Sequence, residues 1–219
     1  DGVTNVETVT LGNAATRVTT VNNLVGNDET LTVTAAALTG TNALTWDGSA
    51  ETDGSFNITG SAQADTITGG FGSDVISAGD GNDTILGGDG DDYILGGLGA
   101  DIINPGAGID MVISGEGNDI IEFLRNLNGE DIVDGGSGED ELRFTDNGIS
   151  STDLDGVKNI EIITLSDAST DIRTVDGLLS TGQSLTVNAG ALSGTNTLSW
   201  DGSAELEGSF NITGSAQDD

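Results

Sequence analysis

A nine-residue phrase that repeats without a gap from Gly69 to Glu122 constrains the fold of this chain more than any other feature. In its six copies the second and fourth residues are always glycine and the sixth is always aspartate. The eighth residue is always isoleucine or valine. Self-similarity at a short fixed period is typical of a solenoid, in which equivalent units stack on one another.

The residue types of the phrase predict the shape of one unit. Its glycines permit positive φ angles and therefore a tight loop whose carbonyl groups turn inward. The three residues after the aspartate alternate outward, inward and outward as in a short strand, so the aliphatic residue enters a core. One nonapeptide buries nothing alone, but two make a coil of about eighteen residues with loops on opposite sides. Stacked coils then bury a ladder of isoleucine and valine.

The stacking of coils also predicts an ion site. Every second loop lies on the same side, so carboxylates and carbonyls of successive loops form oxygen-rich cages. Such cages suit a hard cation with flexible coordination, such as Ca²⁺. Without the cation the stacked carboxylates repel one another, and we expect the loops to stay open. A flexible acidic linker is the alternative, but random composition does not keep aspartate and an aliphatic residue in phase six times.

The phrase resembles the nonapeptide of the RTX family of calcium-binding parallel β-rolls. The resemblance implies an all-β fold in which Ca²⁺ lies between same-side loops, held by motif aspartates and backbone carbonyls. Gly60–Thr68 is a degenerate copy, and the phase resumes after three extra residues, 123–125. With these copies included, the resemblance implies metal ligands at Asp65, Asp74, Asp83, Asp92, Asp101, Asp110, Asp119, Asp131 and Asp140. Pairing of these loops predicts about five to seven Ca²⁺ ions.

The first 59 residues are a second kind of segment, rich in threonine, valine, leucine and asparagine. Alternating apolar and polar residues predict short strands. The expected strands are Glu7–Leu11, Arg17–Val21, Thr30–Ala35, Ala43–Asp47 and Ser55–Thr59. Less regular solenoid coils are the favoured interpretation, and a small β-sandwich is the alternative, although the segment is short for one. Trp46 is expected to lie in the core or in a cap.

The beginning of the chain returns near its end. Residues 155–219 repeat residues 1–65 at an offset of 154, with 39 identities and no gap. This duplication indicates a tandem array of a 154-residue unit. Because Asp1 lies in mid-pattern, we expect the sequence to be part of a longer chain. The predicted regions are 1–59, 60–143 (the calcium roll), 144–154 (a connector) and 155–219.

Charge and composition exclude several functions. The 37 acidic residues against 5 basic ones give a formal charge of −32, which argues against nucleic acid or an anionic membrane as a partner. The chain has no cysteine and no histidine, so disulfides, a Ser-His-Asp triad and histidine-ligated zinc are excluded. No apolar run reaches the length of a transmembrane span, so we expect no membrane insertion. We therefore assign no catalytic residues and predict that the chain is not an enzyme.

These observations favour a secreted, calcium-dependent structural repeat of a bacterial cell-surface assembly, such as a large adhesin, a surface layer (S-layer) or a filament. The RTX resemblance also implies type I secretion as an unfolded chain. Folding would then follow outside the cell, where weak calcium sites are filled. The alternative is an accessory region of a secreted polysaccharide-modifying enzyme or hydrolase, which five scattered basic residues support poorly. An ice- or carbohydrate-binding face would need a regular outward ladder, which the array lacks.

Outward-facing residues of the array predict a contact surface. On one face of the roll we expect an apolar stripe through which neighbouring copies of the repeat associate. The stripe comprises Val75, Tyr93, Leu95, Met111 and Ile113. The alternative is that the chain covers the stripe itself, for example with Phe123 and Leu124.

Overall fold

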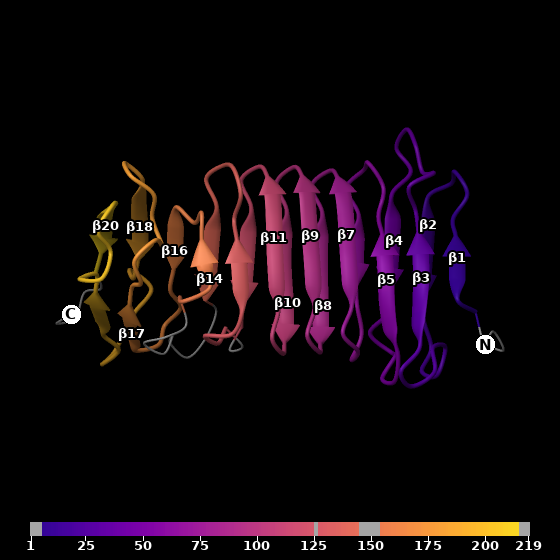
Figure 1. Cartoon of the computed structure of the whole chain (residues 1–219), viewed down its shortest axis with the longest axis horizontal. Helices are drawn as coiled ribbons and strands as arrows, with labels where there is room; N and C mark the ends of the chain where they lie inside the picture. Colours follow the sequence, from indigo (N-terminus) through magenta and orange to yellow (C-terminus); the bar gives the residue numbers. More distant parts are fainter. Residues whose placement is uncertain (1–5, 125–126, 145–153, 215–219) are drawn as a thin grey trace.

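The computed structural model describes residues 6–124, 127–144 and 154–214, and within these ranges all regular secondary structure is β-strand. The strands stack side by side into a rod, with β1 at one end and β20 at the other (Figure 1). The connector predicted at 144–154 falls almost wholly outside the described residues, as does Arg125. No helix in the described part is long and apolar enough to cross a bilayer.

Successive strands alternate between two parallel sheets, here called the odd sheet and the even sheet. The odd sheet has the spatial order β1 (Thr8–Thr10), β3 (Thr30–Thr34), β5 (Ser55–Thr59), β7 (Val75–Asp80), β9 (Tyr93–Leu98), β11 (Met111–Glu116), β13 (Ile132–Asp134) and β15 (Val157–Lys158). The even sheet has the order β2 (Thr16–Thr19), β4 (Leu44–Asp47), β6 (Thr66–Thr68), β8 (Thr84–Asp89), β10 (Ile102–Ala107), β12 (Ile120–Phe123), β14 (Glu141–Phe144), β16 (Ile162–Thr164), β18 (Ser184–Asn188) and β20 (Ser209–Thr213). A further parallel pair joins β17 (Thr170–Arg173) to β19 (Leu198–Asp201).

This topology confirms the predicted parallel β-solenoid. Each strand pairs with the strand two places along the chain, so one coil contributes one strand to each sheet. The β-sandwich alternative is wrong for the flanks, because a sandwich is built from antiparallel neighbours and β1, β3 and β5 pair in parallel. The odd sheet runs from these flanking strands into the nonapeptides, where β5 pairs with β7.

The core is the predicted ladder of aliphatic residues. In the odd sheet Ile76 aligns with Ile94, which aligns with Val112 on the next coil. In the even sheet Ile85 and Ile103 align in the same way. All five side chains are completely buried, because alternation along each strand turns every second residue between the two sheets.

The strands of the array are longer than the sequence pattern predicts. Each strand from β7 to β11 has six residues rather than three, because it continues through the first three positions of the next nonapeptide. Gly79, for example, pairs with Gly97 in the same ladder as the aliphatic residues. The first position of each nonapeptide from Gly69 to Glu122 is buried and continues the inward alternation, and Ala78 and Ser114 fill it with small side chains that are 0 % exposed. The true loop is therefore only three residues long.

The flanking coils follow the same plan with longer loops. The five strands expected in residues 1–59 are present, with bounds that differ from the prediction by at most two residues. Trp46 is 1 % exposed and meets the edge of the Phe56 ring at a centroid distance of 5.3 Å, so it is a core residue as predicted. After β12, the three extra residues change the register from 18 to 21 residues without ending the sheets, as Met111 pairs with Ile132.

Candidate metal centre

Glycines at the strand ends and in the loops of the nonapeptides let one coil stack directly on the next. At the second and fourth positions Gly97 and Gly99 have φ angles of 122° and 126°, a region that L side chains rarely adopt. A Cβ atom on Gly97 would lie 1.8 Å from the carbonyl oxygen of Gly79 on the preceding coil. Any side chain there would push the coils apart, so glycine is required for close stacking of the loops.

All nine predicted aspartates lie at the ends of these loops and are at most 2 % exposed. Each carboxylate reaches across to the previous coil. The backbone N–H of Asp74, for example, donates to Oδ1 of Asp92 at 2.8 Å. Seven such bonds link the aspartates into two columns, one along each side of the rod. The columns are Asp65–Asp83–Asp101–Asp119–Asp140 and Asp74–Asp92–Asp110–Asp131.

The first column continues beyond the nine predicted residues. The N–H of Asp140 donates to Oε2 of Glu161 at 2.9 Å, so a glutamate takes the place of the next aspartate. The sequence reasoning missed Glu161, because it lies in the second copy of the flanking segment, where the nonapeptide phase has ended. At the opposite end the N–H of Leu44 donates to Oδ1 of Asp65 at 2.7 Å.

The second carboxylate oxygen of most motif aspartates has no partner. Within the described residues, Oδ2 is buried without a hydrogen bond in Asp83, Asp92, Asp101, Asp110, Asp119 and Asp140. A Cβ atom built on Gly87 would lie 2.3 Å from Oδ2 of Asp92 and 2.1 Å from the carbonyl oxygen of Pro105. A carboxylate oxygen and a carbonyl oxygen of the next coil therefore meet at one point beside this glycine. Buried acceptors of this kind are costly unless a donor or a cation satisfies them.

The pKa values of the same carboxyl groups are raised above the ordinary value of 3.8. Burial is the main cause, hydrogen bonds from backbone N–H groups oppose it, and carboxylates above and below add to it in most of the loops. The pKa is raised to about 8 for Asp92, to about 7 for Asp83 and Asp140, and to about 6 for Asp74, Asp101 and Asp110. At neutral pH Asp92 therefore favours protonation or a bound cation, whereas Asp74, Asp101 and Asp110 are mostly ionised and are stabilised by a cation.

The comparisons with known proteins agree with this geometry. A family model described as RTX calcium-binding nonapeptide repeat (4 copies) matches residues 57–85, 68–103, 77–112, 95–122 and 127–142. These coils belong to the RTX repeat family. RTX nonapeptide repeats bind calcium, and the matched residues contain all nine motif aspartates. No curated protein and no solved structure matches the chain in these comparisons.

The chemistry of the RTX loops fits Ca²⁺. Among the described residues, no three acidic side chains converge on one point. A cation beside Asp92 would therefore combine one or two carboxylates with several backbone carbonyl oxygens. Ca²⁺ accepts six to eight oxygen ligands of this mixed kind, whereas structural zinc sites require nitrogen or sulfur ligands.

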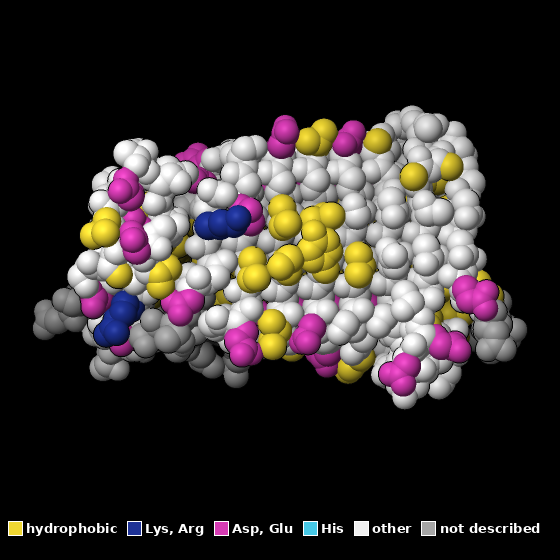
Figure 2. Space-filling model, viewed as in Figure 1, with side chains coloured by type: hydrophobic (Ala, Val, Ile, Leu, Met, Phe, Trp, Pro, Cys, Tyr) yellow, Lys and Arg dark blue, Asp and Glu magenta, His cyan; other side chains and the backbone are white. Residues whose placement is uncertain are grey.

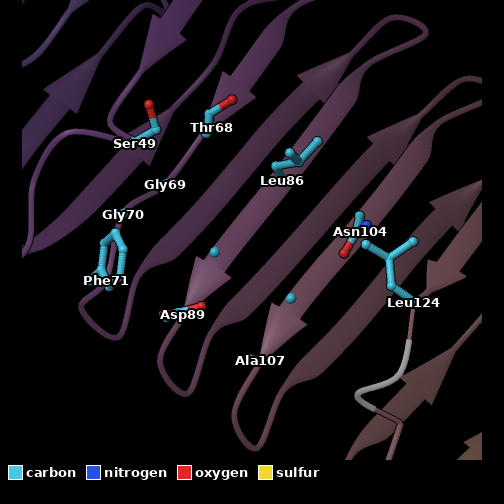
Figure 3. Close-up of a pocket in the computed structure, with 12 residues that line it drawn as sticks. Ser49, Thr68, Gly69, Gly70, Phe71, Leu86, Asp89, Asn104, Ala107 and Leu124 are labelled. Atoms are coloured by element: carbon cyan, nitrogen blue, oxygen red, sulfur yellow. The ribbon is translucent and has the colours of Figure 1, made fainter.

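A groove lies on the outer face of the even sheet, and none of the nine motif aspartates lines it. Figure 3 shows Leu86 and Asn104 on neighbouring strands of this sheet, with Leu124 beside Asn104. The groove has a volume of about 340 Å³, and Asp89 is its only charged lining residue. A single carboxylate offers no acid–base pair and no cationic group for an anionic substrate.

Proposed function

We propose that the chain is a calcium-dependent structural module of a bacterial cell-surface assembly, such as a large adhesin, a surface layer or a filament. The observation that carries the proposal is the pair of buried aspartate columns, in which one oxygen of most carboxylates lacks a partner. At a pH above the pKa values of these carboxyl groups, the charge of such a solenoid is balanced only when cations enter the loops. The bound ion is then a component of the fold rather than a reagent.

The proposed ligands are the nine motif aspartates together with backbone carbonyl oxygens of neighbouring loops. The six unpartnered Oδ2 atoms are the first candidates, and their number is compatible with about five to seven ions. Asp65 and Asp74 have less capacity to bind a cation, because their Oδ2 atoms already accept hydrogen bonds from the N–H groups of Ser61 and Gly70. Asp131 likewise accepts the N–H of Asn128.

Calcium supply links the fold to the place where the protein works. A chain with a net charge of −32 repels itself, so without cations the expanded state is favoured. Ligands that bind only the folded state stabilise it by mass action. Sites of the extracellular class fill at about 10⁻⁴–10⁻³ M Ca²⁺ and would stay empty in a cytosol. We therefore place the folded protein outside the cell after export as an unfolded chain.

A non-catalytic role is supported by the surroundings of the basic residues. Arg143 is held by Glu122 and Glu141 at 2.9 and 2.7 Å. Lys158 contacts Asp134 at 2.9 Å. These cations serve as links between neighbouring coils, and neither lines the groove of Figure 3. The remaining alternative is an accessory RTX region attached to a secreted enzyme.

Lateral contact between copies is proposed through the apolar stripe on the odd sheet. The register places Val75, Tyr93 and Met111 side by side, and it extends the row to Ile132. A hydrophobic patch lies over the middle of this face in Figure 2. Neither residue suggested as an internal cover takes that role. Phe123 is 1 % exposed in the core, and Leu124 lines the groove on the other sheet.

The test of the calcium proposal is chelation. Removal of Ca²⁺ from the full chain should abolish the β-sheet signal of the RTX coils in far-ultraviolet circular dichroism, and millimolar Ca²⁺ should restore it. Mg²⁺ at the same concentration is the control, because its strict octahedral geometry suits these mixed carbonyl sites poorly. A β-rich spectrum that is unchanged by a strong chelator would contradict the proposal.

A further inference from the structure

The first coil presents core side chains at the end of the rod. Val6, Val9, Leu11, Val18 and Leu24 pack against the core but are only partly buried. Several of them line a hollow of about 210 Å³ whose walls include the buried residues Leu31 and Trp46. We call the five partly buried residues the end face. Within the described residues β1 is the last strand of the odd sheet, so its outer side is a sheet edge to which no described strand pairs.

The internal duplication shows the same face in a covered state. The residues at an offset of 154 from the end face are Ile160, Ile163, Leu165, Ile172 and Leu178. All five are at most 2 % exposed. The strands of the two copies have equivalent bounds, so β1 corresponds to β16 and β2 to β17. The two copies differ in the strand that precedes them in the sheet. In the second copy β16 is paired with β14, whereas β1 is the first described strand of its sheet.

We propose that the end face is a docking surface for a further copy of the 154-residue unit, joined before residue 1. Its strands equivalent to β13 and β14 would seat on the end face as those strands seat on the second copy. Thr8, Val9 and Thr10 would pair with the equivalents of Glu141, Leu142 and Arg143, which is the register that β16 adopts. This inference rests on the proposed role as a repeat module.

The aspartate column supplies a second contact across the same junction. Glu161 accepts the N–H of Asp140 and so closes the column at the start of the second copy. Its equivalent in the first copy is Glu7, which is exposed. Glu7 would accept the corresponding N–H from the preceding unit. The carboxylate column of the preceding unit would then end on Glu7, as the column of this unit ends on Glu161.

The docking also fixes the relative orientation of consecutive units. β1, β3 and β5 belong to the odd sheet, but their equivalents β16, β18 and β20 belong to the even sheet. Because the two sheets lie on opposite sides of the rod, the second copy is turned by half a revolution about the rod axis. Each further unit seated in this way would be turned again. The apolar stripe of one unit would therefore face the opposite side from that of the next.

The experiment extends the full chain by a copy of residues 60–154 placed directly before Asp1. Hydrogen exchange of residues 6–25 is then measured in saturating calcium in the extended and original proteins. Covering the end face should slow exchange by roughly tenfold or more, towards the rate of residues 160–179 in the same molecule. Equal hydrogen-exchange rates of residues 6–25 in the two proteins would overturn the proposal. A calcium titration in which the coils stay unfolded would instead contradict the proposed function.

Two variants and one internal comparison complete the design. Glu7→Ala should speed exchange of residues 6–25 in the extended protein but leave the original chain unchanged, and Asp171→Ala, at an exposed acidic position of β17 away from the end face, should alter neither. An extended protein that is insensitive to Glu7→Ala would reject this register. If the extended protein does not fold, hydrogen exchange in the original chain alone tests the proposal. Residues 6–25 must exchange faster there than residues 160–179, and equal protection of the two segments overturns the inference.

Discussion

At the scale of the residue, each motif aspartate uses its two carboxylate oxygens differently. Oδ1 of Asp92 accepts a backbone N–H from the previous coil, which orients the side chain, and Oδ2 is left buried without a partner. In the degenerate repeat both oxygens of Asp65 already have protein partners, because Ser61 donates to them through its N–H and its hydroxyl group. The same residue type therefore has two roles in the array.

This difference predicts a ranking of calcium-site variants. Asp92→Ala should weaken calcium binding by on the order of tenfold, about 1.4 kcal/mol, because it removes an unpartnered oxygen in mid-array. Asp65→Ala should shift the calcium midpoint much less. Calorimetric or spectroscopic calcium titrations of both variants and the parent protein test the order. Three coincident titration curves would refute it.

The raised pKa values predict opposite pH responses with and without metal. Asp92, with its pKa raised from 3.8 to about 8, stabilises the metal-free fold only while it is protonated. The contribution is complete below the unfolded pKa and is lost as the pH rises through the folded-state pKa, which is about 8 for Asp92 and about 6 or 7 for Asp74, Asp83, Asp101, Asp110 and Asp140. Circular dichroism of the metal-free chain should thus show more β-structure at about pH 5 than at about pH 9.

With saturating calcium the order should reverse, because the ion displaces the protons and binds the charged carboxylates. Spectra that change in the same direction in both conditions would show that these groups do not couple the fold to calcium.

At the scale of the element, the sequence predicted the coil better than it predicted the strand. Phase alone places Ile85 inward and Asp83 in the loop, because both recur at fixed positions of the nonapeptide. Strand length cannot be read this way, since glycine has low strand propensity and Gly79 and Gly88 nevertheless pair across coils. Glu161 was not predictable either, as only the three-dimensional stacking brings it beneath Asp140.

The paired glycines lead to a stability prediction. Gly97→Ala should lower the free energy of unfolding by on the order of 1–3 kcal/mol or more, because it adds a Cβ to a left-handed residue against the Gly79 carbonyl. Gly12→Ala is the matched control, as it has open space and no positive φ, and should change stability by less than about 0.5 kcal/mol. Urea unfolding in saturating calcium measures both. Equal midpoints would contradict the requirement for glycine.

At the scale of the whole molecule, the tandem duplication and the parallel stacking were both evident in the sequence, whereas the half-turn between copies was not. Successive strands alternate between the two sheets, and fifteen described strands, β1 to β15, precede β16, the equivalent of β1. Because fifteen is an odd number, β16 lies in the other sheet from β1, which produces the half-turn. The number of strands in one unit depends on stretches of sequence such as the three extra residues 123–125, which follow no repeat pattern.

The apolar stripe gives the prediction for assembly. Met111→Glu should weaken self-association in calcium by on the order of tenfold, about 1.4 kcal/mol, since it places a charge at the centre of the odd-sheet patch. Thr84→Glu, at a partly buried outward position on the even sheet, is the matched control and should associate like the parent. Sedimentation velocity measures both, with calcium titration to show that the fold is retained. Unaltered association of the Met111 variant would rule out this surface.

Every strand crosses the rod, and the hydrogen bonds that join the coils run along it (Figure 1). A pull on the two ends therefore acts on these bonds in line with their direction and removes coils one at a time from an end. A coil of about eighteen residues occupies roughly 4.8 Å of rod length when folded. The same residues span about 60 Å when extended. Each coil that peels away thus releases more than tenfold its own length as slack, and we expect calcium bound in its loops to raise the force at which this happens.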